Sequence, residues 1–461
     1  MPAVDLRPRL VVPAMKSPMG SRTSRESAST GAAFVAEGRD FSLEVSIVAE
    51  VFQFYVGIDW ATASHRVCVI NSAGKILAER AVEHSGRGLA EFLDWLTGLC
   101  QGSPQSVAVA IEIPRGAVVE GLIERGFAVF AINPKQLDRF RDRHTVAGAK
   151  DDSRDAYVLA DSLRTDQPLF KRVKLDAPAI VHLRELSRLD DDLRQDHVRL
   201  QHQFREQLAR YYPQLLALNP SADEPWLWGL FELAPLPARG AKLAASRVEK
   251  LLRQHHIRRL DSQQVGEQLR QPALRLAPGA AEAAAEHALL LLPRLRLVHR
   301  QRLDVARRIQ AVLDELAVQD GDSDKHRDVT LLLSLPGIGR VVAATMLAEA
   351  SQPLADRDYH ALRVYGGIAP VTRQSGKKCR VVMRRACNCR VRDALYHWAR
   401  TSAIFDPHSR EHYQRLRKAG HSHGRALRGV ADRLLAVLVA ILNTGLPYDP
   451  VLRRSQAMQQ T

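Results

Sequence analysis

The sequence predicts an α/β domain followed by a mainly helical remainder, and three observations indicate this fold class. Short apolar runs suited to strands occupy residues 54–83, and predicted helices and strands then alternate up to residue 163, which is typical of a sheet covered by helices. Two long charged stretches, 177–217 and 280–317, have helical spacing. A Leu-Pro-Gly-Ile-Gly turn at 335–339 lies between two further helical stretches, as in a helix-hairpin-helix.

The elements of the α/β part are bounded by turn residues and by changes of hydrophobic period. Three strands precede the first helix, and a turn at 71–74 separates two of them. Strands joined by short turns pair antiparallel, whereas strands separated by a helix pair parallel, so we expect a mixed sheet. The predicted strands span 54–60, 65–70, 75–83, 106–113 and 128–132, and the predicted helices span 88–99, 118–125 and 151–163.

The middle of the chain carries a partial heptad pattern. Leu186, Leu193 and Leu200 are seven residues apart, but Asp196 and Gln203 stand where a coiled coil has apolar residues. The two long helices could therefore pair within the chain as a helical hairpin or across a dimer as a coiled coil. The Pro-containing segment between them does not predict a particular fold.

These changes of pattern divide the chain into five predicted segments. They are a disordered tail at 1–50, an α/β domain at 51–168, a helical and coiled-coil region at 169–325, a mainly helical C-terminal domain at 326–452 and a short tail at 453–461.

The charge of the chain indicates a polyanionic partner. Its 461 residues include 66 Lys and Arg against 51 Asp and Glu, which gives a net charge of +15 and a pI near 9.9. Residues 361–430 alone hold 16 basic and 3 acidic residues. Such an excess suits nucleic acid or an anionic membrane surface. The sequence has no run of 18 or more apolar residues, which argues against a spanning helix.

Four acidic residues stand out by their placement. Asp59 ends one predicted buried strand and Glu112 nearly ends another. Asp152 and Asp155 are three residues apart, so they share one face of a predicted helix. Four converging carboxylates would repel one another unless cations neutralised them, and Mg²⁺ or Mn²⁺ prefers such oxygen ligands.

The order of strand, acid, strand, acid and helix with paired acids is the order that an RNase H-like nuclease needs. Two metal ions about 4 Å apart can activate a nucleophile and stabilise the leaving oxygen at phosphorus. Each acid alone also has a purely structural explanation, because acids are common at strand ends and Asp152 could cap its own helix. The hypothesis of a metal-dependent nuclease therefore depends on the four acids as a set.

Short motifs accompany these acids over residues 54–450. In the first half they are Gly57-Ile58-Asp59, Ile111-Glu112, Asn133-Pro134-Lys135-Gln136, Arg139-Phe140 and Lys150-Asp151-Asp152-Ser153-Arg154-Asp155-Ala156. In the second half they are Leu335-Pro336-Gly337-Ile338-Gly339, Tyr365-Gly366-Gly367-Ile368-Ala369-Pro370, Arg373-Gln374-Ser375-Gly376-Lys377 and Leu446-Pro447-Tyr448-Asp449-Pro450. Together they resemble the DEDD transposases of bacterial insertion sequences, the IS110 family.

The resemblance implies an RNase H-like (RuvC-like) domain and a C-terminal serine transposase domain. In the first, the catalytic metal ligands would be Asp59, Glu112, Asp152 and Asp155. In the second, Ser375 would be a nucleophile that forms a covalent link to DNA in one composite site with those acids. From the residues alone, Ser375 could belong to a plain turn, but its basic surroundings would neutralise a phosphate under attack.

Glycines and basic residues of the C-terminal region are candidates for phosphate contact. The glycines of the 335–339 turn would let backbone N–H groups approach a phosphate closely, although a plain turn between helices fits the same residues. The predicted nucleic-acid-binding residues are Gly337, Gly339, Arg373, Lys377, Lys378, Arg380, Arg384 and Arg385.

The sequence therefore predicts a transposase that cuts and rejoins DNA by Mg-assisted serine–phosphate chemistry. The resemblance further implies a non-coding guide RNA encoded by the element, a homo-oligomer (dimer or tetramer) and a location in the bacterial cytoplasm, at the nucleoid. The second hypothesis is a structure-selective, metal-dependent DNA endonuclease that hydrolyses without a covalent intermediate. A third hypothesis, a catalytically inactive nucleic-acid-binding protein, is disfavoured by the four intact acids.

Overall fold

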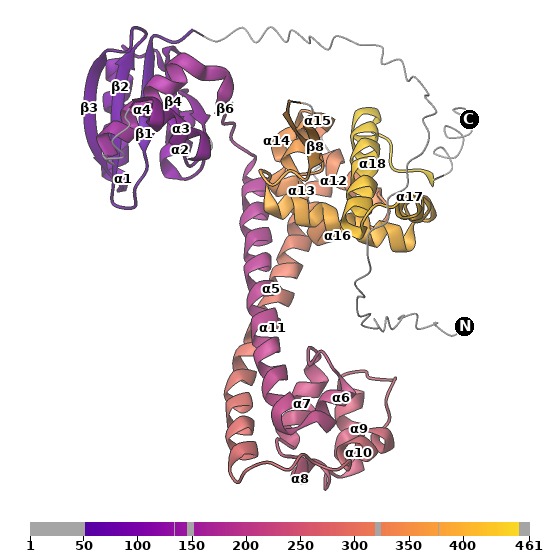
Figure 1. The fold of residues 1–461 in the computed structure, drawn as a ribbon. Coiled ribbons are helices and arrows are strands. Elements are labelled where there is room, and N and C mark those ends of the chain that lie inside the picture. Colours follow the sequence, from indigo (N-terminus) through magenta and orange to yellow (C-terminus); the bar gives the residue numbers. More distant parts are fainter. Residues whose placement is uncertain (1–50, 133, 145–151, 319–323, 377, 451–461) are drawn as a thin grey trace, which may run out of the picture.

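The computed structural model describes residues 51–132, 134–144, 152–318, 324–376 and 378–450. In Figure 1 an N-terminal α/β domain is joined to a long pair of helices, which carries a small helical cluster at one end and the C-terminal helical domain at the other. The predicted tails at 1–50 and 453–461 lie outside the described residues. Within the described part of the chain, no helix is both long and apolar enough to cross a membrane.

The N-terminal domain contains a six-stranded sheet in the order β3-β2-β1-β4-β5-β6. β1 pairs parallel with β4, and β4 parallel with β5, while the other three pairings are antiparallel. The predicted mixed sheet is therefore confirmed. The strands are β1 (Phe54–Asp59), β2 (Ser64–Asn71), β3 (Ile76–Glu83), β4 (Val107–Ile111), β5 (Ala128–Ala131) and β6 (Lys171–Arg172).

Helices cover both faces of this sheet (Figure 1). One face packs against α1 (Gly86–Leu99) and α2 (Ala117–Glu124), and the other against α3 (Pro134–His144) and α4 (Asp152–Asp166). All five residues of β4 are buried, as expected for a parallel strand covered on two sides. The sequence did not predict β6, which is too short to show a period, or α3, in which charged and polar residues predominate.

Helix α4 approaches β1 closely at Gly57. A Cβ atom on Gly57 would lie 1.9 Å from the carbonyl oxygen of Ala156 and 2.7 Å from the backbone nitrogen of Ala160. Only a residue without a side chain permits this contact between backbones. The small Ala156 and Ala160 allow the same approach from the helix side.

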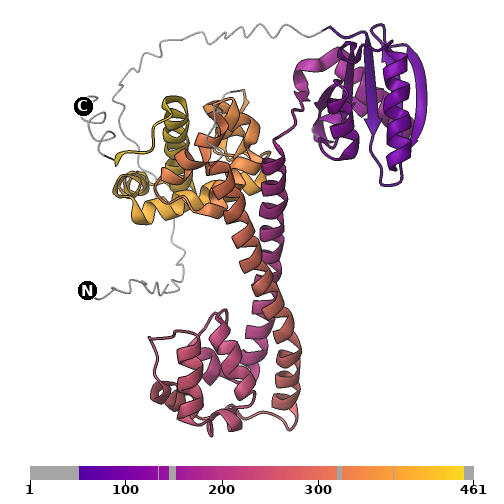
Figure 2. The ribbon, with the colours of Figure 1, turned by 180° about the vertical axis from the view of Figure 1, so that it is seen from behind.

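The two long helices pair within the chain. Figures 1 and 2 show α5 (Pro178–Tyr211) and α11 (Ala280–Val318) side by side, and they run in opposite directions. Of the two arrangements left open by the heptad pattern, the hairpin is the one found. The buried stripe of α5 includes the polar residues Asp190 and His197 among its leucines, which explains why the heptad is incomplete.

The Pro-containing middle segment folds into five helices at the far end of this pair. A core of aromatic side chains, including Phe204, Trp226, Trp228 and Phe231, holds them against α5 and α11. The helices are α6 (Pro213–Leu218), α7 (Pro225–Leu233), α8 (Pro237–Gly240), α9 (Ala245–Gln254) and α10 (Ser262–Leu269). The first three begin with a proline, and the side chain of Asp261 caps the start of α10.

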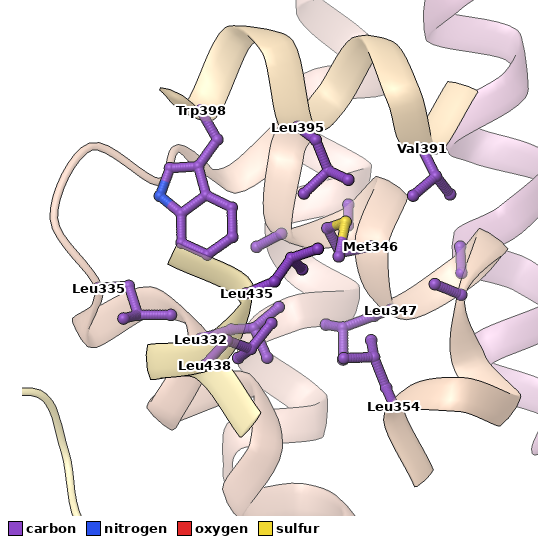
Figure 3. Packing of buried hydrophobic residues seen from close by; sticks show 14 of the residues in the cluster. Leu332, Leu335, Met346, Leu347, Leu354, Val391, Leu395, Trp398, Leu435 and Leu438 are labelled. Atoms are coloured by element: carbon purple, nitrogen blue, oxygen red, sulfur yellow. The ribbon is translucent and has the colours of Figure 1, made fainter. Parts of the chain in front are cut away.

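The C-terminal domain surrounds one large apolar core. Figure 3 shows Trp398, Leu395, Leu435 and Met346 meeting in it. The helices are α12 (Asp324–Ser334), α13 (Arg340–Glu349), α14 (Ser351–Ala355), α15 (Tyr359–Tyr365), α16 (Cys389–Phe405), α17 (Pro407–Lys418) and α18 (His423–Thr444), and two strands, β7 (Val371–Ser375) and β8 (Lys378–Val382), form a hairpin. From the residues alone Ser375 could belong to a plain turn, and the structure places it at the end of the strand β7.

An ion pair and a hydrogen bond from arginines fasten the start of α5 to the C-terminal domain. Arg188 donates to Glu349 at 2.7 Å, and Arg184 donates to the carbonyl oxygen of Ala348 at 2.8 Å. Burial alone would raise the pKa of Glu349, but the hydrogen bond and charge of Arg188 outweigh it and the pKa is lowered. The carboxylate is thus held ionised at this junction.

We expect Gly57→Ala to destabilise the N-terminal domain by about 1–3 kcal/mol, because the added Cβ would force the backbone of α4 away from β1. Urea unfolding followed by circular dichroism measures this change. Gly98→Ala in α1 is the control, because a Cβ there meets no atom within 4 Å. Equal free energies of unfolding for the two variants would contradict the packing role of Gly57.

Acidification is expected to weaken the long helix pair through His197. Burial, followed by the charges of Arg302 and His299, lowers the pKa of this histidine. The unfolded chain therefore binds more protons than the folded one, so stability falls as the pH drops below about 6.5. The fall in melting temperature between pH 7.5 and pH 5.5 should be smaller in His197→Phe than in the wild type. The control is His202→Phe, which alters an exposed residue of the same helix, and an unchanged fall in His197→Phe would contradict the assignment.

Candidate active site

Two of the predicted acids lie at the same edge of the sheet. Ile58 of β1 pairs with Ile111 of β4 in a parallel register, and the next residues along the two strands are Asp59 and Glu112. Side chains alternate along a strand, so Asp59 is on the face of Gly57 that α4 covers. Both acids are half-buried. The structure therefore brings the ends of these two strands, and their acids, together.

The third described acid, Asp155, lies one turn into α4. Its side chain is only 4% exposed, and Arg141 of α3 holds both of its oxygens, with Nε–Oδ1 at 2.8 Å and Nη2–Oδ2 at 2.9 Å. Its neighbour Ala156 contacts Gly57, which is two residues before Asp59 in β1. This turn of α4 is therefore fixed against β1. The fourth acid, Asp152, is the first residue of α4. Its side chain and the whole of Asp151 are not among the parts of the chain that the structure describes.

Arg141 is a residue that the sequence did not single out. Its side chain is 30% exposed, and it also bonds Asp138 at 2.8 Å on its own helix. Without such a partner a buried carboxylate would carry a large desolvation cost. A basic residue in an otherwise polar helix gives no local signal of this role, because its partner is 14 residues away and enters by tertiary packing.

The donor set of these acids suits a divalent cation. Carboxylate oxygens are the ligands that Mg²⁺ prefers, and a carboxylate has about four lone-pair sites, so Asp155 keeps acceptor capacity beside Arg141. Among the residues whose side chains are described, no three acids, histidines or cysteines already form a metal-binding group. Asp59, Glu112 and Asp155 alone therefore do not form a metal-binding group, and a complete ligand cluster would also need Asp152.

The predicted serine lies on the β7–β8 hairpin. Ser375 is the last residue of β7, is exposed, and faces Lys378 across the turn. Arg373 faces Arg380 directly on the neighbouring strand. Like charges opposite each other destabilise a hairpin, so this pairing favours a polyanionic partner that would offset the repulsion. Lys377 lies outside the described residues.

The remaining predicted contacts differ in their surroundings. Arg385 is exposed, whereas Arg384 is half-buried and donates to the carbonyl oxygen of Ala369 at 3.2 Å. Gly339 immediately precedes α13 and has open space around it. Gly337 has φ +73° and packs against the backbone of Ser402, where a Cβ would lie 2.7 Å from the Ser402 nitrogen. Its conformation thus has a packing reason within the protein.

Acidic strand ends in one domain and a strongly basic hairpin in another are typical of an enzyme that transfers phosphoryl groups in nucleic acid. Two family models match this chain. Residues 56–213 match a model described as a transposase with DEDD residues of the IS110 group, and residues 329–414 match one described as the transposase IS116/IS110/IS902 family.

Curated relatives agree with these models. The mini-circle putative transposase for IS117 of Streptomyces coelicolor is 31% identical over 404 residues, which cover 86% of this chain and 95% of that protein. The putative transposase y4uE of Sinorhizobium fredii is 48% identical over 211 residues, covering 45% of this chain and 58% of that protein. An IS900 protein of Mycobacterium paratuberculosis is 27% identical, covering 87% of this chain and 99% of that protein.

The chain belongs to the IS110 family of transposases. It is a DNA transposase of an insertion sequence, and membership of this family implies DNA binding. DEDD transposases generally depend on divalent metal.

Arg141→Met should destabilise the protein by about 3–5 kcal/mol in EDTA, because Asp155 would stay buried without its partner. Added Mg²⁺ should restore part of this loss if a cation can neutralise the same carboxylate. Urea unfolding with and without Mg²⁺ measures both effects. Arg87→Met, which breaks an exposed ion pair with Glu91, should leave the unfolding free energy essentially unchanged. A stable Arg141→Met variant in EDTA would contradict the pairing.

Proposed function

We propose that this transposase cuts and rejoins DNA with a site made of two parts. In the N-terminal domain, Asp59, Glu112, Asp152 and Asp155 would hold Mg²⁺, with Mn²⁺ as a substitute, and in the C-terminal domain Ser375 would be the nucleophile. The observation that carries the proposal is the meeting of Asp59 and Glu112 at parallel strand ends under α4.

We further propose that the N-terminal domain is RNase H-like. Its order of elements supports this: three antiparallel strands come first, two parallel strands with helices follow, and a helix with paired acids packs across the first strand. The acids then come from the first strand, the fourth strand and that helix. This is the distribution that a carboxylate nuclease site requires.

In this proposal the protein residues have separate tasks. A divalent ion bound by the carboxylates would supply charge neutralisation at the phosphorus under attack. Asp59 and Glu112 would fix the position of that ion, because each lies at the end of a buried strand. Arg141 pairs with the buried Asp155 and holds that carboxylate in place inside the domain. The cations of the hairpin hold the DNA backbone beside Ser375.

The covalent step is a balanced exchange at phosphorus. The Oγ of Ser375 forms a bond to phosphorus, the bond from phosphorus to a sugar oxygen breaks, and that oxygen takes up a proton while the serine proton passes to a base. In the second step a DNA hydroxyl attacks the same phosphorus and releases Ser375. β7 and β8 contain no acid or histidine, so the base would come from outside the hairpin.

Two features support an assembly of several chains. The acids and Ser375 belong to domains that lie apart in Figures 1 and 2, so a composite site would need either a domain movement or a second copy. A homodimer or tetramer would supply the copy. We also propose a non-coding RNA from the element as guide, which the family resemblance suggests and the positive charge of the chain would accommodate.

Hydrolysis without a covalent intermediate is the alternative function. The exposed position of Ser375, with no acid or histidine on β7 or β8, favours it. A structure-selective endonuclease would use the four acids and water, and Ser375 would be dispensable.

A covalent-capture assay tests the proposal. The protein is incubated with Mg²⁺, DNA spanning the boundaries of its element and RNA transcribed from the flanks, and is then denatured in SDS. We expect a protein–DNA adduct that is lost in Ser375→Ala and in Asp59→Asn. Thr372→Ala, on the same exposed hairpin, and Asp94→Asn, on the surface of α1, are matched controls that should keep the adduct.

The outcomes separate the candidate functions. Cut DNA without an adduct, unaffected by Ser375→Ala, would replace the serine mechanism by hydrolysis. Strand transfer at the wild-type level in Asp59→Asn would refute the metal-ligand assignment. Omission of the RNA should abolish the reaction, and cleavage at the same site without it would remove the guide from the proposal.

A further inference from the structure

A cleft of about 830 Å³ lies between the N-terminal and C-terminal domains. One wall comes from the ends of the central strands and from β6, and the other from the start of α5 and from α14 and α15. Trp60 and Ile113 line the first wall, and each directly follows one of the acids Asp59 and Glu112. The cleft therefore opens at the same sheet edge as the candidate metal ligands.

The cleft is basic where it is exposed. Six basic and four acidic residues line it. Two of the acids, Asp176 and Glu349, are already paired with Arg184 and Arg188. The exposed cations are Arg115, Lys171, Arg172 and Lys174, and they make the wall attractive to phosphate.

An aromatic group forms the rim of the cleft beside Asp59. Trp60 is 37% exposed, although tryptophan is usually buried. Its ring lies 6.1 Å from that of His65 and 6.5 Å from that of His84. Trp60 is thus a partly exposed aromatic ring in contact with two histidine rings.

The hydrogen bonds of the two histidines define which nitrogen of His84 carries a proton. The backbone N–H of Ala61 donates to Nδ1 of the buried His65 at 3.3 Å, so the proton of a neutral His65 is on Nε2. That N–H donates to Nδ1 of His84 at 2.8 Å. Burial, together with the nearby His84, lowers the pKa of His65, which keeps the ring neutral. The proton of neutral His84 is then on Nε2, and this exposed ring lines the cleft.

We propose that Trp60 and His84 form a subsite for one unpaired nucleotide of a nucleic-acid strand, whose base stacks on Trp60 and whose phosphate accepts a hydrogen bond from Nε2 of His84. The subsite rests on the proposed function, because it would hold the nucleotide next to the phosphate at Asp59 and Glu112. A partly exposed indole ring, an N–H donor and a cationic wall are the parts from which single-strand sites are built. A paired base would not expose its face to Trp60.

Equilibrium binding of the full-length protein tests this subsite. Fluorescence anisotropy with a fluorescein-labelled dT₁₂ strand is measured in EDTA at several salt concentrations. Trp60→Ala should weaken binding about five- to a hundredfold, as expected for loss of one stacked base. The salt slope should stay the same because no phosphate contact of a cation is removed. His84→Ala should weaken binding about three- to tenfold.

Conservative variants and a matched control show whether a loss of binding comes from the ring of Trp60 and the N–H donor of His84. Trp60→Phe and His84→Gln keep a ring face and an N–H donor, so both should bind within about threefold of the wild type. Phe405→Ala removes another exposed aromatic side chain, outside the cleft, and should bind like the wild type. A 12-base-pair duplex should bind Trp60→Ala and the wild type alike.

Two results would overturn the subsite: wild-type affinity of Trp60→Ala for the single strand, or an equal loss for the duplex. A parallel series with rU₁₂ decides whether DNA or RNA is the better occupant. Loss of dT₁₂ binding in Trp60→Ala together with an absent serine adduct in the wild type would refute the serine chemistry and keep the subsite, so the two failures are distinguishable.

Discussion

The contact of two backbones at Gly57 is the constraint on which the candidate site depends. Because Gly57 has no side chain, α4 can lie directly on β1, with Ala156 and Ala160 against the strand. The same approach brings the turn that carries Asp155 to the strand end that carries Asp59. Two acids that are 96 positions apart in the sequence thereby lie on elements that pack directly together, and Glu112 directly follows the buried adjacent strand β4.

The candidate metal ligands and the candidate nucleophile Ser375 belong to two different domains. The α5–α11 pair connects them, and Arg184 and Arg188 at the start of α5 fasten that helix to the C-terminal domain. The hairpin with Ser375 is exposed and carries arginines that face each other. Such local repulsion is tolerated on a stable scaffold, and a nucleic-acid partner would relieve it. The cleft between the domains gives that partner a route toward the acids.

Much of the fold was predictable because its signals are local. The strands at 54–71 and the two long helices follow from hydrophobic period and turn residues, and the structure agrees with them. β6 and α3 were missed because one is two residues long and the other is polar. The β7–β8 hairpin was not predicted because its residues are nearly all exposed, so its strands show almost no alternation of buried and exposed side chains.

The sequence by itself determined which residues could do chemistry: four acids at strand ends and on one helix, and a serine among cations. The tertiary structure decided which of them meet. It brought the strand ends of Asp59 and Glu112 together, added Arg141 as the partner of Asp155, and gave Gly337 a packing role against Ser402. It also placed Trp60 and His84 on a cleft. The physical reason is that contacts between distant residues come from sheet register and helix packing, which leave no periodic trace in the sequence.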